Sequence, residues 1–266
     1  MTPTAMRTHD WRLAADGRHL FARSWHPSDD PCHAPVLLFH DSLGCVELWR
    51  DFPQVLAEKT GRTIVAYDRP GFGRSDPHPG RLERDFVKLE SRRTIPLLQR
   101  ELGFARFIAC GHSIGGGMAV EAAAHHRENC IALVTMGAQA FVEDVTRNGI
   151  ILARKEFERP ENMARLERYH GSKAGWVLDA WTTTWLSPDF ADWTLDAAIG
   201  HRACPALVIH GELDQYGSSE HPRRIAGRAG HVEILGGIGH VPHREATAHV
   251  AGLIARFLAG IPVLDR

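Results

Sequence analysis

A serine between glycines is the residue of this chain whose neighbours best suit a nucleophile. Ser113 lies in Gly111–Gly115 (Gly-His-Ser-Ile-Gly), which matches the G-x-S-x-G pattern of a strained turn that exposes the serine hydroxyl. An apolar run at 104–110 predicts a strand before the turn, and an alanine-rich run at 118–126 predicts a helix after it. The free N–H groups and positive dipole end of that helix would face an oxyanion formed at the serine.

A phosphate-binding loop is a less suitable interpretation of the same glycines. No Lys-Ser or Lys-Thr closes the run, and no G-x-G-x-x-G pattern follows the first predicted strand. A short glycine motif is weak evidence by itself. The nucleophile interpretation therefore depends on a base and a carboxylate elsewhere in the chain.

A carboxylate and a histidine follow two later strands. Asp214 comes after the predicted strand 205–210, and His240 comes after the predicted strand 231–235. Both residues thus lie just beyond the carboxyl ends of strands, the edge at which sites form in open parallel sheets. A serine hydroxyl needs such a base to become nucleophilic, and the base needs a group that orients it.

Other residues compete for these two supporting roles. Glu212 and Asp144 are alternative carboxylates, and Asp214 could instead cap the helix that follows it. His243 is the alternative base. We prefer His240 because a glycine precedes it, whereas His243 follows a proline.

Histidine is abundant, with 17 residues, but its spacing does not predict a metal site. His125 and His126 are adjacent and so point to different faces of a helix, and neither H-E-x-x-H nor paired C-x-x-C occurs. We expect no metal and no organic cofactor. Five cysteines without regular spacing indicate reduced thiols and not a disulfide framework.

The composition is that of an ordinary globular protein of 266 residues, with 44% hydrophobic and 24% charged residues. A formal net charge of −1 gives no electrostatic attraction for nucleic acid or an anionic membrane. No run approaches the ~18 apolar residues of a membrane span, and residues 1–10 lack the apolar core of a signal peptide. We expect a small-molecule substrate, no nucleic-acid or membrane partner, a cytoplasmic location, and a monomer or homodimer.

Strand and helix patterns alternate along most of the chain. Two alternating runs, 11–13 and 19–25, flank Asp16-Gly17 and predict an antiparallel hairpin. Continuous apolar runs predict buried strands at 35–39, 63–67, 104–110, 130–136, 205–210 and 231–235. Helical spacing predicts helices at 48–59, 85–102 with a kink at Pro96, 219–228 and 245–258. The alternation predicts an α/β fold with a mostly parallel, doubly wound sheet.

The segment 141–200 interrupts this alternation. Residues 157–169 and 173–185 have helical patterns, and an unstructured stretch of this length would be unusual. We therefore expect a helical lid inserted into a core formed by 1–140 and 201–266.

Tryptophan is concentrated in the predicted lid, which holds four of the seven. Such side chains would line an apolar pocket, and Trp181 and Trp185 are our candidates for contact with substrate. Alternatively, they hold a small subdomain onto the sheet, since tryptophan is mainly a large hydrophobe with one polar group.

Four motifs together resemble the α/β-hydrolase fold family over nearly the whole chain. In chain order they are 67–76 (YDRPGFGRSD), 111–116 (GHSIGG), 210–214 (HGELD) and 239–245 (GHVPHRE). The order Ser113, Asp214, His240 is also that of the family's triad. The resemblance implies Ser113 as nucleophile, His240 as general base and then acid, and Asp214 as the carboxylate that orients the imidazole. Serine implies acyl transfer, because family members that open epoxides or displace halides use aspartate there.

The resemblance also implies an oxyanion hole with two N–H donors. One is that of Ile114, and the other comes from the loop after 35–39, where Ser42 is the first choice and Leu43 the alternative. The family usually has His-Gly in that loop, whereas this chain has Asp41. Aspartate tolerates positive φ less well and adds a charge beside an anion site. We expect its side chain to turn away and hydrogen-bond its own loop, the alternative being an effect on substrate choice.

These features predict a carboxylic ester hydrolase or lactonase that acts on a small, fairly apolar substrate through an acyl-enzyme. The same triad could instead cleave a carbon–carbon bond of a vinylogous diketone, or an amide. Relatives that split ring-fission products often carry asparagine where this chain has His112. A ligand receptor on a hydrolase fold is the contrasting class, and multiple turnovers would distinguish an enzyme from it.

Overall fold

The computed structural model describes residues 6–15, 17–27 and 33–261. The strands are β1 (Arg7–Ala15), β2 (Arg18–His26), β3 (Val36–Phe39), β4 (Ile64–Tyr67), β5 (Phe107–His112), β6 (Cys130–Met136), β7 (Ala206–Gly211) and β8 (His231–Leu235). The helices are α1 (Phe52–Thr60), α2 (Phe86–Leu102), α3 (Ile114–His125), α4 (Asp144–Glu156), α5 (Pro160–His170), α6 (Ala174–Leu186), α7 (Asp196–His201), α8 (Glu220–Ala226), α9 (Pro242–Glu245) and α10 (Thr247–Ala259).

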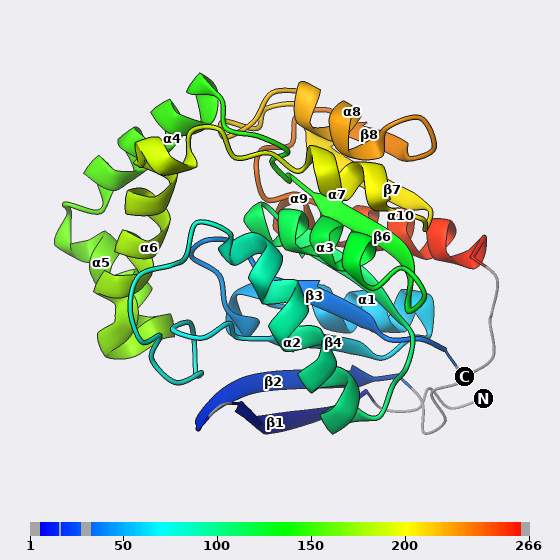
Figure 1. Cartoon of the computed structure of the whole chain (residues 1–266). Coiled ribbons are helices and arrows are strands. Elements are labelled where there is room, and N and C mark those ends of the chain that lie inside the picture. The colour runs from blue at the N-terminus through cyan, green and yellow to red at the C-terminus, as the bar shows by residue number, and fades with distance from the viewer. Residues whose placement is uncertain (1–5, 16, 28–32, 262–266) are drawn as a thin grey trace.

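The described strands form one sheet in the order β1-β2-β4-β3-β5-β6-β7-β8, with helices on both faces (Figure 1). The β1–β2 and β2–β4 pairs are antiparallel, and every other pair is parallel. The predicted α/β fold class, with a mostly parallel sheet and an antiparallel start, is therefore confirmed.

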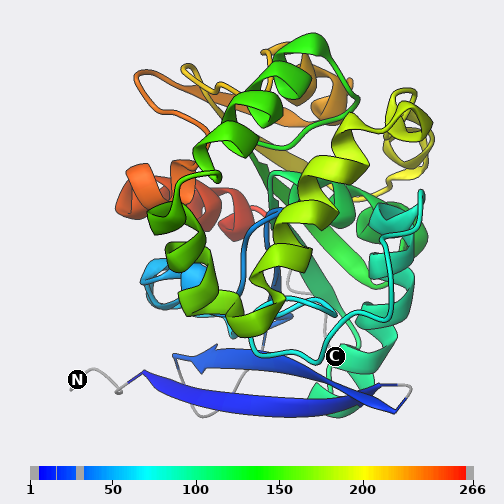
Figure 2. The same cartoon turned by 90° about the vertical axis from the view of Figure 1, so that its left-hand side faces the viewer.

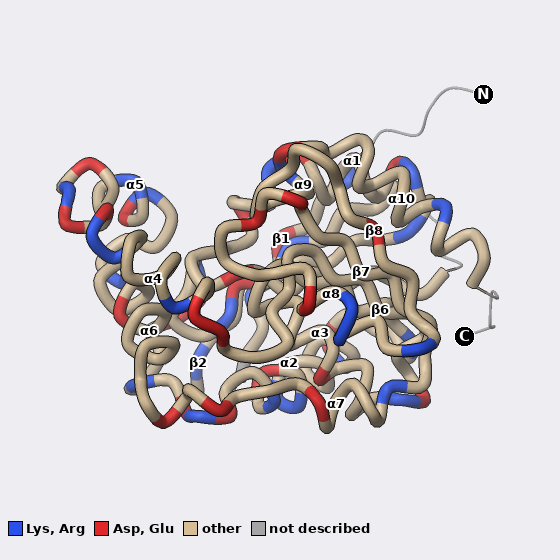
Figure 3. Tube along the Cα trace, turned by 90° about the horizontal axis from the view of Figure 1, so that it is seen from above, with Lys and Arg blue, Asp and Glu red and all other residues tan. Residues whose placement is uncertain are grey.

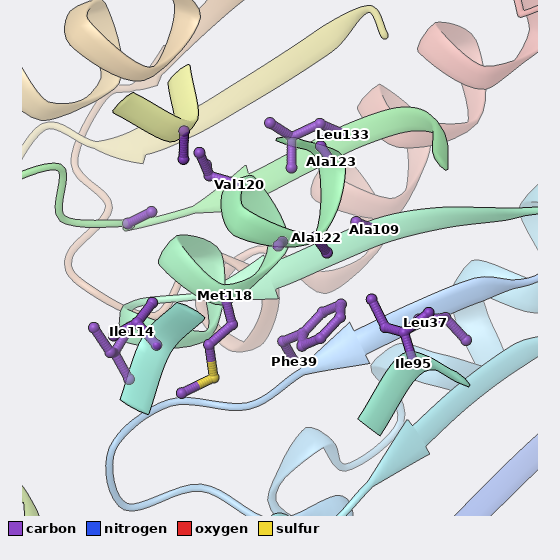
Figure 4. Close-up of a cluster of buried hydrophobic side chains, with 14 of the residues drawn as sticks. Leu37, Phe39, Ile95, Ala109, Ile114, Met118, Val120, Ala122, Ala123 and Leu133 are labelled. Carbon is purple, nitrogen blue, oxygen red and sulfur yellow. The ribbon is translucent and has the colours of Figure 1, made fainter. Parts of the chain in front are cut away.

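The central strands are buried on both faces because successive side chains point to opposite sides of a sheet. In β3, Leu37 and Phe39 belong to the core beneath α2 and α3, whereas Val36 and Leu38 belong to the core beneath α1 and α10. Figure 4 shows the first of these cores, with Phe39 between the side chains of α2 and α3. Burial of each such side chain stabilises the fold by about 1.5–3 kcal/mol. The sheet is therefore stable enough to hold the loops at its edge in fixed positions.

The predicted hairpin is present and longer than the sequence pattern indicated. Residues from Arg7 to Ala15 pair with residues from His26 back to Arg18, which leaves a two-residue turn. Gly17 has φ 76°, the left-handed conformation that favours glycine in such turns. Asp16, the other turn residue, lies outside the described residues, as do residues 1–5 of the stretch examined for a signal peptide.

Several element boundaries differ from the sequence prediction, among them those of the strand before Ser113 and of the helix after β3. The strand predicted at 104–110 is β5, which starts three residues later and continues to the residue before Ser113. The helix predicted at 48–59 is a short 3₁₀ helix, Val46–Trp49, followed by α1, which has proline in its first turn where no N–H is needed. α2 extends on both sides of Pro96 as one helix, and the kink remains a prediction.

Between β6 and β7 the chain forms four helices in place of one crossover helix. α6 packs against α4 and α5, and these three helices project to one side of the sheet in Figure 1 and lie in front of it in Figure 2. α7 packs instead on α3, against the sheet. The sequence prediction contained counterparts of α5 and α6 but missed α4, whose Gly149 and polar first turn weaken the helical pattern. The lid boundaries 141–200 remain a prediction.

The distribution of charges, the hydropathy of the helices and the state of the thiols add three further findings. Acidic and basic residues are intermixed along the trace in Figure 3. Among the described residues, no helix is both long and apolar enough to cross a membrane. The four described cysteines are buried and free of disulfides, and Cys32 lies outside the described residues.

Candidate active site

Ser113 occupies a tight turn between β5 and α3. Its backbone has φ 55° and ψ −128°, and Arg50 is the one other described non-glycine residue with positive φ. Neighbouring glycines allow the turn to close, because a Cβ at Gly115 would overlap the carbonyl oxygen of Phe39 and one at Gly111 would overlap that of Gly115. Such strained backbone costs on the order of 1–3 kcal/mol and is typical of functional sites.

Three side chains predicted to act together meet at this turn. His240 Nε2 lies 3.1 Å from Ser113 Oγ, and His240 Nδ1 lies 2.9 and 2.8 Å from the two carboxylate oxygens of Asp214. Because Nδ1 faces a carboxylate, it carries the proton of the neutral ring. The lone pair of Nε2 is then free to accept the hydroxyl proton of Ser113.

Burial and neighbouring groups shift the pKa values of both supporting residues. Burial lowers the pKa of His240 and outweighs the hydrogen bond and charge of Asp214, which raise it. For Asp214, burial raises the pKa. The hydrogen bond and charge of His240 and the N–H of Tyr216 lower it by more than burial raises it, so the net shift is downward. A neutral imidazole beside an ionised carboxylate is the state that a general base requires.

The competing residues lie away from the nucleophile. Glu212 is exposed and accepts a hydrogen bond from the N–H of Gly237 at 2.9 Å. Asp144 is exposed at the start of α4. His243 is buried, and its ring packs against Trp49 at 4.6 Å between centroids. The structure therefore brings Asp214 and His240 to the serine, and not these alternatives.

The two predicted oxyanion donors face no protein acceptor within the described residues. Ile114 begins α3, so its N–H has no partner in the helix, and the N–H of Ser42 likewise makes no hydrogen bond there. The N–H of Leu43 instead donates to Asp41 Oδ1 at 3.2 Å. Of these two alternatives, only the N–H of Ser42 is unengaged within the described residues.

Asp41 hydrogen-bonds its own loop, as expected from the sequence, but its side chain does not turn away from the cavity over Ser113. Besides accepting the Leu43 N–H, its carboxylate lies 3.2 Å from Nδ1 of His112, a contact that the sequence did not suggest. Partial burial raises the pKa of Asp41, but the hydrogen bond and charge of His112 dominate and hold it well below its usual range. The side chain is 27% exposed and contributes to the wall of the cavity described next.

A cavity of about 160 Å³ lies over Ser113. Trp181 and Trp185 of α6 line it, as predicted, together with Ile150 of α4. Trp176 lies outside it and stacks on His78, with a centroid distance of 5.1 Å. The predicted pocket role thus fits two of the inserted tryptophans, and the alternative packing role fits a third.

Sequence reasoning missed several residues of this cavity. The side-chain oxygen Oε1 of Gln139 lies 3.3 Å from Ser113 Oγ and is a second acceptor for its hydroxyl proton beside His240 Nε2. The Tyr216 and His240 rings lie 4.8 Å apart between centroids. Gln139 follows β6 at the same sheet edge at which Asp214 follows β7. This position just after a parallel strand could have identified Gln139 as a site residue from the sequence. Thr146 also lines the cavity but carries no comparable signal, because its placement depends on how α4 packs.

Among the described residues, no group of three or more His, Cys, Asp or Glu side chains is placed to hold a metal ion.

The turn, the triad geometry and the sheet define the class of protein. Residues 34–179, more than half of the chain, match the alpha/beta hydrolase fold family, and the chain belongs to that family. It is 27% identical over 251 residues to 2-hydroxymuconate semialdehyde hydrolase of Pseudomonas sp. (strain CF600), covering 85% of this chain and 87% of that protein. It is 29% identical over 217 residues to serine hydrolase BPHL of Homo sapiens, covering 76% and 69%.

Solved structures share the fold at lower sequence identity. The enol-lactonase from Burkholderia xenovorans LB400 aligns with a TM-score of 0.72 and 19% identity, over 93% of this chain and 99% of that one. A bacterial membrane phospholipase A aligns with a TM-score of 0.75 and 20% identity, over 96% and 86%. At this identity the likeness concerns the fold alone.

Proposed function

We propose that this chain is a serine hydrolase that cleaves small, uncharged carboxylic esters or lactones through an acyl-enzyme. The observation that carries the proposal is the hydrogen-bonded series of Ser113, His240 and Asp214 beside two unengaged N–H groups. Similarity over most of the chain to two proteins named as hydrolases supports it.

The reaction would begin with attack of Ser113 Oγ on the substrate carbonyl carbon while His240 Nε2 takes the hydroxyl proton. The N–H groups of Ile114 and Ser42 would receive the oxyanion, and one such donor is typically worth about 10²–10³ in kcat. His240 would then give its proton to the leaving alkoxide, and water activated by the same ring would release the acid. With a lactone, the product is a single hydroxy acid.

The cavity limits the size of the acyl group. A cavity of about 150 Å³ accommodates benzene, so the 160 Å³ over Ser113 suits an acyl group of about six carbon atoms. Trp181, Trp185 and Ile150 offer it apolar walls.

The charge of the cavity favours a neutral substrate. No Lys or Arg is among the described residues that line it, whereas the carboxylate of Asp41 is. A substrate carboxylate would therefore be desolvated in the cavity without a Lys or Arg side chain among the described lining residues to bind it. Neutral esters and lactones avoid this cost.

Carbon–carbon bond cleavage by the same triad is the second candidate. It is favoured by the similarity to 2-hydroxymuconate semialdehyde hydrolase. His112 before the nucleophile and the absence of a cation among the described lining residues count against it. The inserted helices α4–α6, within the predicted lid 141–200, would select the substrate in either case.

A substrate screen on wild type and Ser113→Ala tests the proposal. Neutral p-nitrophenyl esters, lactones and a vinylogous diketone are assayed in parallel, with Ser219→Ala, a change at an exposed serine, as matched control. We expect ester or lactone turnover that falls by about 10⁴-fold or more in Ser113→Ala and is unchanged in the control. An equal rate in Ser113→Ala would refute the role of this serine, and stoichiometric binding without turnover would favour a receptor.

A further inference from the structure

His112, the residue before the candidate nucleophile, has a hydrogen-bond acceptor at each ring nitrogen. Its Nδ1 lies 3.2 Å from Asp41 Oδ2, and its Nε2 lies 2.8 Å from the backbone carbonyl oxygen of His240. A carbonyl oxygen only accepts hydrogen bonds, and so does an ionised carboxylate. Both contacts are therefore satisfied together when the ring carries a proton on each nitrogen.

The surroundings of the ring indicate that the second proton lies on the imidazole of His112 and that Asp41 is ionised, so that the two side chains form an ion pair. The Oδ1 atom of Asp41 accepts the N–H of Leu43, which an ionised carboxylate does best. The His112 side chain is 2% exposed, and a charge buried to this degree requires an opposite charge in contact.

Two more histidines face His112. The ring of His240 lies 5.0 Å from it and that of His243 lies 4.7 Å from it, between centroids. Burial lowers the pKa of both neighbours, and the charge of His112 lowers each further. Of the three rings, His112 is the one with a carboxylate or carbonyl oxygen at both ring nitrogens.

The contacts of the pair reach three segments of the site. Asp41 closes a turn around Ser42 by accepting the N–H of Leu43, and the carbonyl of Asp41 is itself held by Arg69 Nη2 at 2.8 Å. His112 belongs to the nucleophile turn, and its Nε2–H holds the main chain of the His240 loop. One ring thus connects the oxyanion loop, the nucleophile turn and the loop of the base.

We propose that Asp41 and the imidazolium of His112 form a charge-compensated pair that positions the Ser42 donor and the His240 loop. The second role of His112 is to neutralise a carboxylate that lines the cavity next to a developing oxyanion. Both residues are positioning residues, since neither is placed to bond with the reacting atoms. The kinetic consequence rests on the proposed hydrolase function, whereas the protonation state does not.

The kinetic test compares His112→Gln, Asp41→Asn and the double variant. Glutamine retains an N–H donor for the His240 carbonyl but removes the positive charge, which leaves Asp41 uncompensated. We expect kcat for a neutral ester to fall about 10- to 100-fold in His112→Gln with little change in KM, because the oxyanion exists only in the transition state. Adding Asp41→Asn should restore at least about fivefold of that loss, a non-additivity expected of groups in contact. His249→Gln, at an exposed histidine, is the matched control and should show wild-type kinetics.

A double variant no more active than His112→Gln would overturn the charge compensation. Nitrogen-15 NMR of the histidine rings supplies a test that needs no turnover and no variant. In wild type at neutral pH, both ring nitrogens of His112, assigned through its backbone, should carry protons. A singly protonated His112 ring would overturn the pair even if the protein hydrolyses esters. A doubly protonated ring in a protein without esterase activity would leave the pair intact and remove the proposed function.

Discussion

Replacing Trp181 by alanine should lengthen the acyl chain that the site accepts. Trp181 lines the cavity over Ser113, and its ring faces that of Tyr216 at 6.0 Å between centroids. The indole forms part of the cavity wall, whereas the helix α6 that carries it is held by its other contacts with α4 and α5. Truncation to alanine therefore opens the cavity beyond its present 160 Å³ without removing a member of the triad.

The size of the effect follows from the cavity volume. In wild type, methylene groups beyond about the sixth carbon find no room in the cavity and contribute no further burial. In Trp181→Ala, each added methylene that is buried contributes about 0.8 kcal/mol, or about fourfold in kcat/KM. The ratio of kcat/KM for octanoate to that for hexanoate should therefore rise about 16-fold, since the two esters differ by two methylene groups.

The assay is hydrolysis of p-nitrophenyl esters from acetate to decanoate. Trp176→Ala is the matched control, because Trp176 lies on the same helix but outside the cavity, where its Nε1–H donates to the carbonyl oxygen of Gly80 at 2.8 Å. The control should retain the wild-type chain-length profile. An unchanged profile in Trp181→Ala, or the same shift in both variants, would show that the acyl group does not bind against α6.

Three further predictions concern the nucleophile and its base. Asp214→Asn should lower kcat about 10⁴-fold because the amide no longer fixes the proton on His240 Nδ1, whereas Glu212→Gln should leave ester hydrolysis unchanged. The base must be neutral, and burial lowers the pKa of His240. We therefore expect kcat/KM to rise with pH through one ionisation below pH 6.5 and to remain flat above it. A pH-rate profile with its inflection above pH 6.5 would contradict this. Ser113→Gly should be more stable than Ser113→Ala by about 1 kcal/mol in urea unfolding, since glycine tolerates φ 55° and alanine does not, and the reverse order would argue against backbone strain at this turn.

The sheet and the triad were predictable because their signals are local. Continuous apolar runs mark strands buried on both faces, and Asp214 and His240 each follow such a run within a few residues. The carboxyl ends of parallel strands meet at one edge, so position after a strand already implies proximity to Ser113. The competing residues Glu212 and His243 share this sequence context, and three-dimensional contacts were needed to separate them.

The cavity wall and the Asp41–His112 contact were not predictable from the sequence. Asp41 and His112 lie on different strand ends, and no periodicity links residues so far apart in the chain. The placement of Ile150 depends on how α4 packs against α6, which neither helix propensity nor hydrophobic spacing specifies. Such contacts follow from tertiary packing. The triad residues are therefore predictable from the sequence, whereas the residues of the cavity wall that would contact a substrate are not.

A second buried histidine shows how the surroundings decide the charge of such rings. His170, at the end of α5, accepts the N–H of Gly73 at Nδ1 (2.9 Å) and donates from Nε2 to the carbonyl of Leu43 (3.0 Å). One donor and one acceptor match a neutral ring, and burial lowers the pKa of His170 accordingly. His112 meets two acceptors instead, one of them a carboxylate. The oxyanion loop is thus held on one side by a neutral ring from the inserted helices and on the other by a charged ring from the nucleophile turn, so a change in either contact is expected to move the Ser42 donor.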